Sequence, residues 1–442
     1  MNSAAAAPRA QLDDIEKSIA ALESQKGRLL EDLGSLKYPV LTLPNEITVE
    51  IFLHFVSVMR QENHRPQPYH AVLKLASVCQ SWRAVTLSTC ALWNDGVKVD
   101  CHSIRDAGQL LEVCLARAGS LPLDLDIRLP DDEISRDTIS STLGLYGSQW
   151  RHVHLSSPDI VSNWILDLNY HFPSSLPVLE SFTLSDIQTG SSLRHAPQLR
   201  ELSLRNSSWA IQLGLPLNKL TKLDLIRFDI TPLLAVLAYT PNLECLQLAY
   251  GYATEDTQVV PLSVLLPHLH TFVCEQDPST MVLQYLTLPA LERIELVYYL
   301  SDAGVRAILS CVARSCSTIR TLNINHLAFN DAYDCLRSLP TIRHLCLSQL
   351  SWSNDQQDSF FAAMVSGGCL PVLESLTCEE CWPQIRADKL IAVVSARWLG
   401  VEGTTKLNSV SLDFDEDSNP EFANAFDQLY ELGRQGLKLA IT

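Results

Sequence analysis

The sequence predicts an α/β solenoid, in which parallel strands line the inner face of an irregular arc and helices and loops form its outside, with a helical region before it. Two observations support this fold class: a short leucine pattern recurs after residue 96, and helical spacing governs the residues before it. The chain has 442 residues, too many for one compact core, and 47% of them are hydrophobic. Several packed units are therefore expected.

The recurring pattern is L-x-x-L-x-L with conservative replacements. Clear copies begin at Leu199, Leu220, Leu243, Leu291, Ile319 and Ile342, and weaker copies at Trp150, Leu179, Leu269, Leu373 and Leu407. Starting positions lie 20 to 34 residues apart. The last two apolar residues of each copy point to one side of a strand. Because one strand cannot bury that side alone, stacked copies predict a leucine-rich-repeat solenoid over residues 96–442.

The segments between copies are expected to form the outer wall. Helical patterns occupy residues 231–239, 303–314, 356–365 and 388–398, and an amphipathic helix over 421–435 is expected to cap the open end, with Gly436 ending it. Most copies lack an asparagine after the last leucine, which favours longer, uneven units.

Residues 9–36 are predicted to form one helix with a heptad seam. The seam residues with 3,4 spacing are Leu12, Ile15, Ile19, Leu22, Leu29, Leu33 and Leu36, and Lys26 holds the single seam position that is not apolar. An isolated helix of this length is marginal in water, so the apolar stripe needs a partner. Two partners remain open: a second copy, giving a homodimer, or the body of the same chain.

Residues 38–95 are predicted to form a compact helical block. Pro44 and Glu46 mark a helix start, and the helix is expected to run from 45 to about 59. A polar loop over 60–69 follows, then a second helix over 71–87 and a short third element that ends at Leu92-Trp93.

The anchor residues of this block, in order, are Leu43-Pro44, Glu46-Ile47, Ile51-Phe52, the run LASVCQSWR over residues 75–83, and Leu92-Trp93. They resemble an F-box, the three-helix module of ubiquitin-ligase receptor subunits. The whole layout, with a heptad helix before the block and leucine-rich repeats after it, is similar to F-box proteins abundant in mushroom-forming fungi. The loop between the first two helices is longer than the family usually shows.

The resemblance implies a partner and a role. In the family this block binds a Skp-type adaptor, which bridges to a cullin and a RING subunit, and the remaining domain holds a protein substrate. Carried over, Leu43, Pro44, Ile47 and Ile51 belong to the adaptor face, while Leu75, Val78, Trp82 and Trp93 either join that face or hold the helices together. Two alternatives are a simple helical cap on the repeats and a scaffold protein, without a ligase role, assembled through residues 9–36.

The inner face of the arc is the expected target-binding surface. Residues around the last two apolar positions of each copy should form columns across neighbouring strands. The candidate target-binding residues are Arg205, Asp224, Ile226, Gln247, Val273, Glu275, Glu295, Val297, Asn323 and Asn325. No arginine cluster of the kind that binds phosphate occurs among them, which favours a folded protein or an unmodified peptide. The alternative is that these columns are solvated surface.

Charge and cysteine usage restrict the remaining function classes. The net charge of −17 repels phosphate backbones, which argues against nucleic-acid partners. The 13 cysteines show no framework spacing, as expected in the cytosol or nucleus. Residues 1–10 do not resemble a signal peptide, and no apolar run of ~18 residues predicts a membrane span.

Reactive motifs are sparse. Cys378 and Cys381 have metal-type spacing, but a second pair is missing and a tetrahedral zinc site needs four ligands. His152 and His154 share one strand face without further ligands nearby in the sequence. We find no nucleophile elbow, phosphate-binding loop or metalloprotease helix, so no cofactor and no catalytic residue are expected, and a hydrolase joined to the repeats ranks last.

Overall fold

The computed structural model contains two compact units. It describes residues 6–35, 43–62, 68–94, 97–102, 104, 106–130, 132–157, 165–166, 175–185, 188–189, 195–205, 216–252, 263–275, 280–297, 301–325, 328–349, 352–381, 385–413 and 423–441. Unit 1 comprises Met1–Trp93 with Arg117–Gly119, and unit 2 comprises Asn94–Ala116 with Ser120–Thr442.

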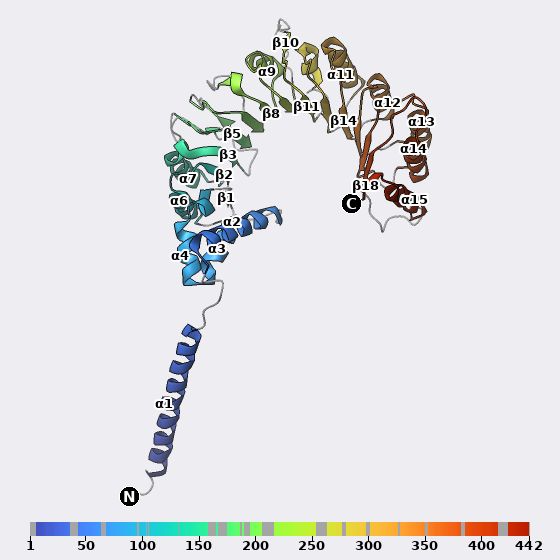
Figure 1. Cartoon of the computed structure of the whole chain (residues 1–442). Helices are drawn as coiled ribbons and strands as arrows, with labels where there is room; N and C mark the ends of the chain where they lie inside the picture. Colours follow the sequence, from blue (N-terminus) through green and yellow to red (C-terminus); the bar gives the residue numbers. More distant parts are fainter. Residues whose placement is uncertain are drawn as a thin grey trace. The chain divides into compact units, whose positions relative to one another are not determined.

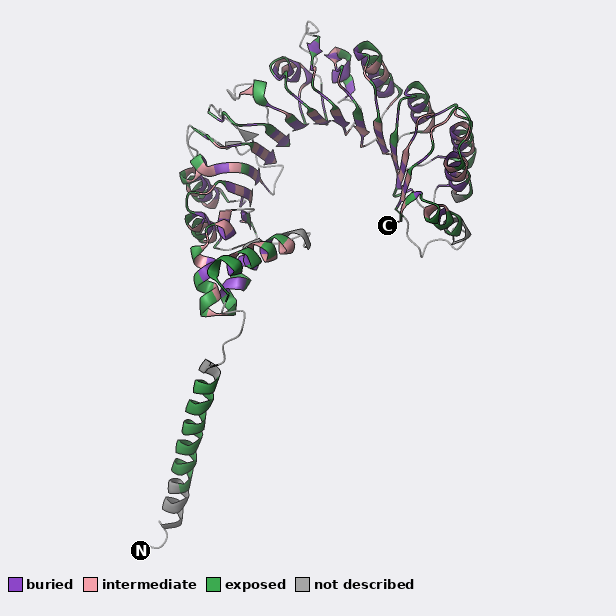
Figure 2. Ribbon diagram, in the orientation of Figure 1, coloured by how far each residue is buried: buried purple, intermediate pink, exposed green. Residues whose placement is uncertain are grey.

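Unit 1 is helical. Its helices are α1 (Ala6–Ser35), α2 (Asn45–Glu62), α3 (Pro68–Val78), α4 (Gln80–Ser88) and α5 (Ala91–Asn94). The core of α2 to α5 includes Phe52 and Val56 of α2, and the indole of Trp82 meets the ring of Phe52 edge-on at a centroid distance of 4.9 Å. All side chains of α1 that the structure describes, residues 14–32, are exposed (Figure 2).

The prediction of one helix over 71–87 is wrong, because Cys79 interrupts the helix and separates α3 from α4. Its backbone is extended, with φ −156° and ψ 170°, and its Sγ accepts a hydrogen bond from the Trp82 amide at 3.4 Å. Cys79 therefore acts as the N-cap of α4. The predicted loop over 60–69 is also too long, since α2 extends to Glu62 and α3 begins at Pro68, where a proline costs no helical hydrogen bond.

Unit 2 is built on one parallel sheet of 14 strands in the order β1-β2-β3-β5-β7-β8-β9-β11-β13-β14-β15-β16-β17-β18. The strands are β1 (Val97–Asp100), β2 (Leu123–Arg128), β3 (Trp150–Ser156), β5 (Ser181–Ser185), β7 (Glu201–Arg205), β8 (Lys222–Ile226), β9 (Cys245–Ala249), β11 (Thr271–Cys274), β13 (Arg293–Leu296), β14 (Thr321–Asn325), β15 (His344–Ser348), β16 (Ser375–Glu379), β17 (Ser409–Leu412) and β18 (Lys438–Ile441). Two short parallel pairs accompany them: β4 (Ile165–Leu166) with β6 (Gln188–Thr189), and β10 (Val264–Leu265) with β12 (Leu286–Thr287).

Helices cover one face of this sheet. They are α6 (Ala107–Ala118), α7 (Glu133–Leu145), α9 (Ile230–Leu237), α11 (Asp302–Ser315), α12 (Phe329–Ser338), α13 (Asn354–Val365), α14 (Ala387–Leu399) and α15 (Ala423–Arg434). Within unit 2 the strands line the inner side of a curve and the helices its outer side (Figure 1). None of the helices that the structure describes combines the length and the apolar character needed to cross a membrane.

The eleven copies of the leucine pattern each coincide with one strand of the long sheet, from β3 to β17. In the copy on β9, for example, Leu243, Leu246 and Leu248 are all fully buried. The prediction of stacked parallel strands is therefore confirmed. Four predicted outer helices correspond to α9, α11, α13 and α14, whereas α6, α7 and α12 were not predicted.

The C-terminal helix does not form the edge of the array. The chain turns at Gly436, with φ 110°, and continues as β18, which pairs in parallel with β17. Leu437 is buried at this turn. The last strand, β18, thus forms the C-terminal edge of the sheet. The expectation that the helix over residues 421–435 caps the open end of the array is therefore wrong.

Candidate docking surfaces

Helix α2 presents apolar side chains to solvent at its start. Leu43, two residues before the helix, is 36% exposed. Within α2, Ile47 is 49% and Ile51 47% exposed, and their spacing of four residues puts these two on one side of the helix. The amide of Thr48 already donates to the Pro44 carbonyl at 3.1 Å, so the helical hydrogen bonds begin at Pro44. We call Leu43, Ile47 and Ile51 the α2 face.

The structure separates the other predicted adaptor residues into two groups. Leu75 and Trp93 are buried, and Trp93 Nε1 donates to the Thr86 carbonyl at 2.8 Å. Trp82 is half-buried against Phe52. Leu75 and Trp93 therefore fit the alternative in which they hold the helices of unit 1 together, whereas Trp82 keeps part of its surface accessible. Pro44 and Val78 are exposed, as a docking residue must be.

Leu73 on α3 is a further exposed aliphatic residue, 43% accessible, outside the set predicted from the sequence. Its neighbours Val72, Leu75 and Ala76 supply the buried side of α3, and Leu73 lies off that stripe. The sequence signal that could have identified Leu73 as exposed is its position outside the apolar stripe of the predicted helix.

The inner face of unit 2 carries columns of side chains in strict register. Ser203 pairs with Asp224, Asp224 with Gln247, and Gln247 with Val273. The same column continues through Glu295, Asn323, Cys346, Thr377 and Ser411. The register predicted for these residues is confirmed, and we call this set the central column.

Two candidate target-binding residues are less available than expected. Asp224 is 4% exposed; its Oδ2 accepts from Ser203 Oγ at 2.8 Å and from Arg205 Nη2 at 2.8 Å. Arg205 Nε also reaches this oxygen, at 3.1 Å, so Asp224 Oδ1 is left buried without a hydrogen-bond partner among the described residues. Val273 is buried.

The remaining candidates are accessible in part. Gln247 Nε2 donates to Glu275 Oε1 at 2.9 Å, and Glu295 pairs with Arg293. The other half-buried candidates are Ile226, Val297, Asn323 and Asn325, whereas Arg205 is exposed.

A hollow of about 400 Å³ lies on β5, β7 and β8 at the inner face. Besides Leu202, its lining combines four hydroxyl side chains, two cations, two carboxylates and a histidine: Ser181, Thr183, Ser185, Ser203, Arg205, Lys222, Glu201, Asp224 and His154. Because the two carboxylates balance the two cations, this hollow suits an uncharged polar segment better than a phosphate group.

The histidines of β3 face carboxylates on β2. His152 Nδ1 lies 2.8 Å from Asp124 Oδ1, and His154 Nδ1 lies 3.0 Å from Asp126 Oδ1. Burial raises the pKa of Asp124, but hydrogen bonds and charge from Arg151 and His152 outweigh it and leave that pKa below its usual value. These pairs stabilise neighbouring strands, and no group of three metal-ligating side chains occurs in the described part of the chain.

The Cys378–Cys381 pair belongs to the core. Both residues are buried, and Cys381 Sγ donates to the Leu347 carbonyl at 3.3 Å. The hydrogen bond with Cys381 and burial both raise the pKa of the Cys378 thiol well above its usual value. A protonated, enclosed thiol is a poor nucleophile.

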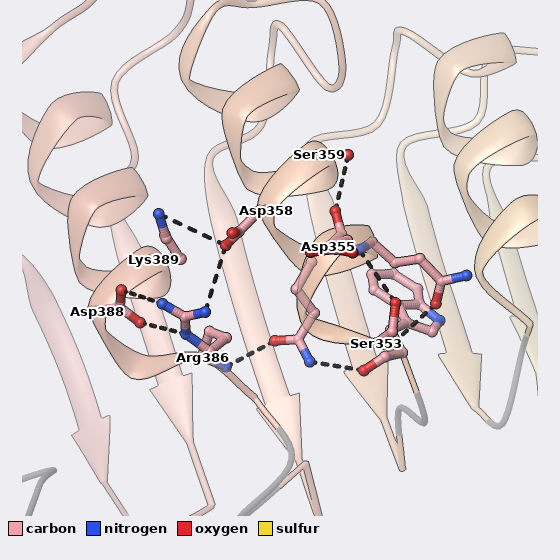
Figure 3. Close-up of polar contacts among 10 residues, drawn as sticks. Ser353, Asp355, Asp358, Ser359, Arg386, Asp388 and Lys389 are labelled. Atoms are coloured by element: carbon pink, nitrogen blue, oxygen red, sulfur yellow. Dashed lines mark hydrogen bonds and ion pairs between the residues drawn. The ribbon is translucent and has the colours of Figure 1, made fainter.

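The outer face of unit 2 carries an ion-pair network between α13 and α14 (Figure 3). Arg386 forms a two-pronged pair with Asp388 at 2.9 and 2.8 Å, and Asp358 lies 3.9 Å from Arg386 and 3.7 Å from Lys389. Beside it, the buried Gln357 joins the Arg386 amide to the Trp352 carbonyl. These contacts link two adjacent outer helices.

Comparisons with known proteins do not assign a family. No protein-family model matches the chain, and no curated protein matches its sequence. A crystal structure of a protein from Bacteroides fragilis is similar over 74% of this chain and 76% of that chain, with 10% sequence identity and a TM-score of 0.34. A likeness of that size carries no argument about function.

Proposed function

We propose that this chain is the substrate-recognition subunit of a cullin-RING (SCF-type) ubiquitin ligase. In this proposal unit 1 is an F-box that docks a Skp-type adaptor, and the leucine-rich repeats of unit 2 hold the target protein. The observation that supports adaptor docking most directly is the α2 face, where three aliphatic side chains are 36–49% exposed, two of them one turn apart on α2.

The exposure of the α2 face is not explained by the folding of unit 1. Helix α2 already places Phe52 and Val56 in the core, both at most 2% exposed. Ile47 and Ile51 lie on another side of the helix and, with Leu43 just before it, remain in water, where a row of aliphatic groups is unfavourable. A row of this kind fits a partner that receives a helix face in an apolar groove.

The proposed role needs no reaction centre in this chain. A substrate receptor accelerates ubiquitin transfer by holding the target near other subunits, which raises the effective concentration of the reacting groups. The surface proposed to hold the target is the inner face of unit 2, with the central column and the hollow on β5, β7 and β8. The balanced charges of this surface favour a folded protein or an unmodified peptide as the target. The proposed compartment is the cytosol or the nucleus.

Replacing Leu43 and Ile47 together with alanine should weaken adaptor binding about fiftyfold, since each truncation removes roughly 1 kcal/mol or more of apolar burial from the interface. Binding of a purified Skp-type adaptor to the full chain, measured by titration calorimetry, tests this. Both side chains are half-exposed in the free chain, so the variant should keep its circular dichroism spectrum and its unfolding midpoint.

The matched control replaces two exposed aliphatic residues of unit 2, Ile134 and Leu145 on α7, each 81% exposed. Ile134→Ala with Leu145→Ala removes a similar apolar area without touching unit 1, so adaptor affinity should not change. Equal affinity of the Leu43→Ala, Ile47→Ala variant and the unaltered chain would overturn the adaptor proposal.

A second candidate function is a repeat scaffold without a ligase role, assembled through its N-terminal helix. The specific observation that favours it is the exposed apolar stripe of α1, including Ile15, Ile19 and Leu22. A chain that fails to bind the adaptor but forms concentration-dependent dimers, lost on removal of residues 1–36, would support the scaffold over the ligase receptor.

A further inference from the structure

Helix α1 exposes an apolar stripe that no described part of the chain covers. It is 30 residues long, and Ile15, Ile19, Leu22 and Leu29 are between 51% and 64% exposed. Leu30, 58% exposed, lies beside this seam and widens it. Sustained 3,4 spacing of this kind packs best against another helix with the same spacing. A second copy of α1 meets that requirement by construction.

The charges beside the seam decide how two copies can pair. Lys26 occupies an a position of the heptad, and Glu23 occupies the flanking e position three residues before it. In a parallel pair the a positions face each other, so Lys26 would meet Lys26 of the second copy. The nearest flanking residue of that copy would be Gln25, which is neutral and leaves the two ammonium groups uncompensated.

An antiparallel pair removes this repulsion. In that arrangement the a positions of one copy face the d positions of the other. The two seams overlap along their full length when each seam residue meets the residue of the second copy whose number adds to its own to give 48. Ile19 then packs on Leu29 of the second copy, and Lys26 packs its aliphatic stem on Leu22 of that copy. Glu23, at the e position, directly follows Leu22. The Lys26 ammonium, whose stem lies on Leu22 of the second copy, therefore reaches the Glu23 carboxylate of that copy. Two-fold symmetry makes this contact twice.

We propose that α1 is a self-association element that forms an antiparallel two-helix pair with a second copy of this chain, its orientation set by Lys26 and Glu23. This inference does not depend on the ubiquitin-ligase proposal. Loss of adaptor binding leaves it intact, and loss of self-association leaves adaptor binding intact.

Charge reversal in the full chain tests the orientation. Lys26→Glu and Glu23→Lys should each weaken the dimer about tenfold in sedimentation equilibrium, because two ion pairs are lost and replaced by repulsion. The double variant should return the dissociation constant to within about threefold of the unaltered chain, because the pairs re-form with exchanged signs. Lys17→Glu, on the opposite side of the helix at an f position, is the matched control and should change little.

Cysteine pairing gives an independent readout. A mixture of Ile19→Cys and Leu29→Cys chains should form disulfide-linked heterodimers on mild oxidation, located by peptide mass mapping, whereas either variant alone should not crosslink through its new cysteine. The unaltered chain, treated identically, accounts for its native thiols. Self-crosslinking of Ile19→Cys would show a parallel pair, and a chain that stays monomeric at about 100 μM would show no pair; either result overturns the proposal.

Discussion

Replacing Phe272 with alanine should lower the free energy of unfolding of unit 2 by about 3–5 kcal/mol. Phe272 lies on β11, is fully buried, and is paired in register with Leu246 on one side and Ile294 on the other. Its ring fills the layer between sheet and outer wall, so truncation leaves a cavity in the middle of the repeat array. Each repeat contacts mainly its neighbours, so this loss creates a weak point between the two halves.

Urea unfolding followed by circular dichroism, with limited proteolysis to locate the opened segment, measures the effect. The control is Thr271→Ala on the same strand, whose half-buried side chain lies on the other side of the sheet and should cost less than about 1 kcal/mol. Similar losses for Phe272→Ala and Thr271→Ala would mean that this layer is not the core of the array.

Replacing Arg397 with methionine should cost about 3 kcal/mol, although the change removes a buried charge. Arg397 on α14 is fully buried and donates to the carbonyls of Met364 at 3.1 Å and Leu370 at 2.9 Å, with a longer bond to Leu373. Burial lowers the pKa of its guanidinium. Methionine fills a similar volume but removes the guanidinium donors from these enclosed carbonyl oxygens, of which Leu370 O keeps the Leu373 amide at 3.2 Å.

The contrasting variant is Arg386→Met, which breaks the surface network of Figure 3. Exposed ion pairs contribute little because water and salt screen them, so its thermal unfolding midpoint should match that of the unaltered chain. If Arg386→Met proves as damaging as Arg397→Met, the carbonyl contacts of Arg397 do not account for its role.

Much of unit 2 could be predicted from the sequence because its repeated hexamer encodes a strand directly. Strands β1, β2 and β18 were missed because they lack the leading leucine of the template, as in β2, where Leu123, Leu125 and Ile127 alternate with accessible residues. Helix α12 was missed because its buried residues, such as Cys335 and Leu336, are few among polar ones.

The docking surfaces were harder to predict, because the sequence pattern shows that a residue is apolar but not which neighbour covers it. Leu75 and Ile47 fit the same helical pattern, yet Leu75 is 5% and Ile47 49% exposed. The break at Cys79 depends on its side chain accepting a backbone hydrogen bond, which helical spacing alone does not reveal. Asp224 looked available on the inner face, but Ser203 and Arg205 enclose it.

Hydrogen exchange on the full chain, with and without a purified Skp-type adaptor, tests the proposed function most directly. We expect slower exchange in peptides covering residues 43–51, at the start of α2, and unchanged exchange along the strands of unit 2. Adaptor binding that protects the inner strands while residues 43–51 exchange as in the free chain would contradict it.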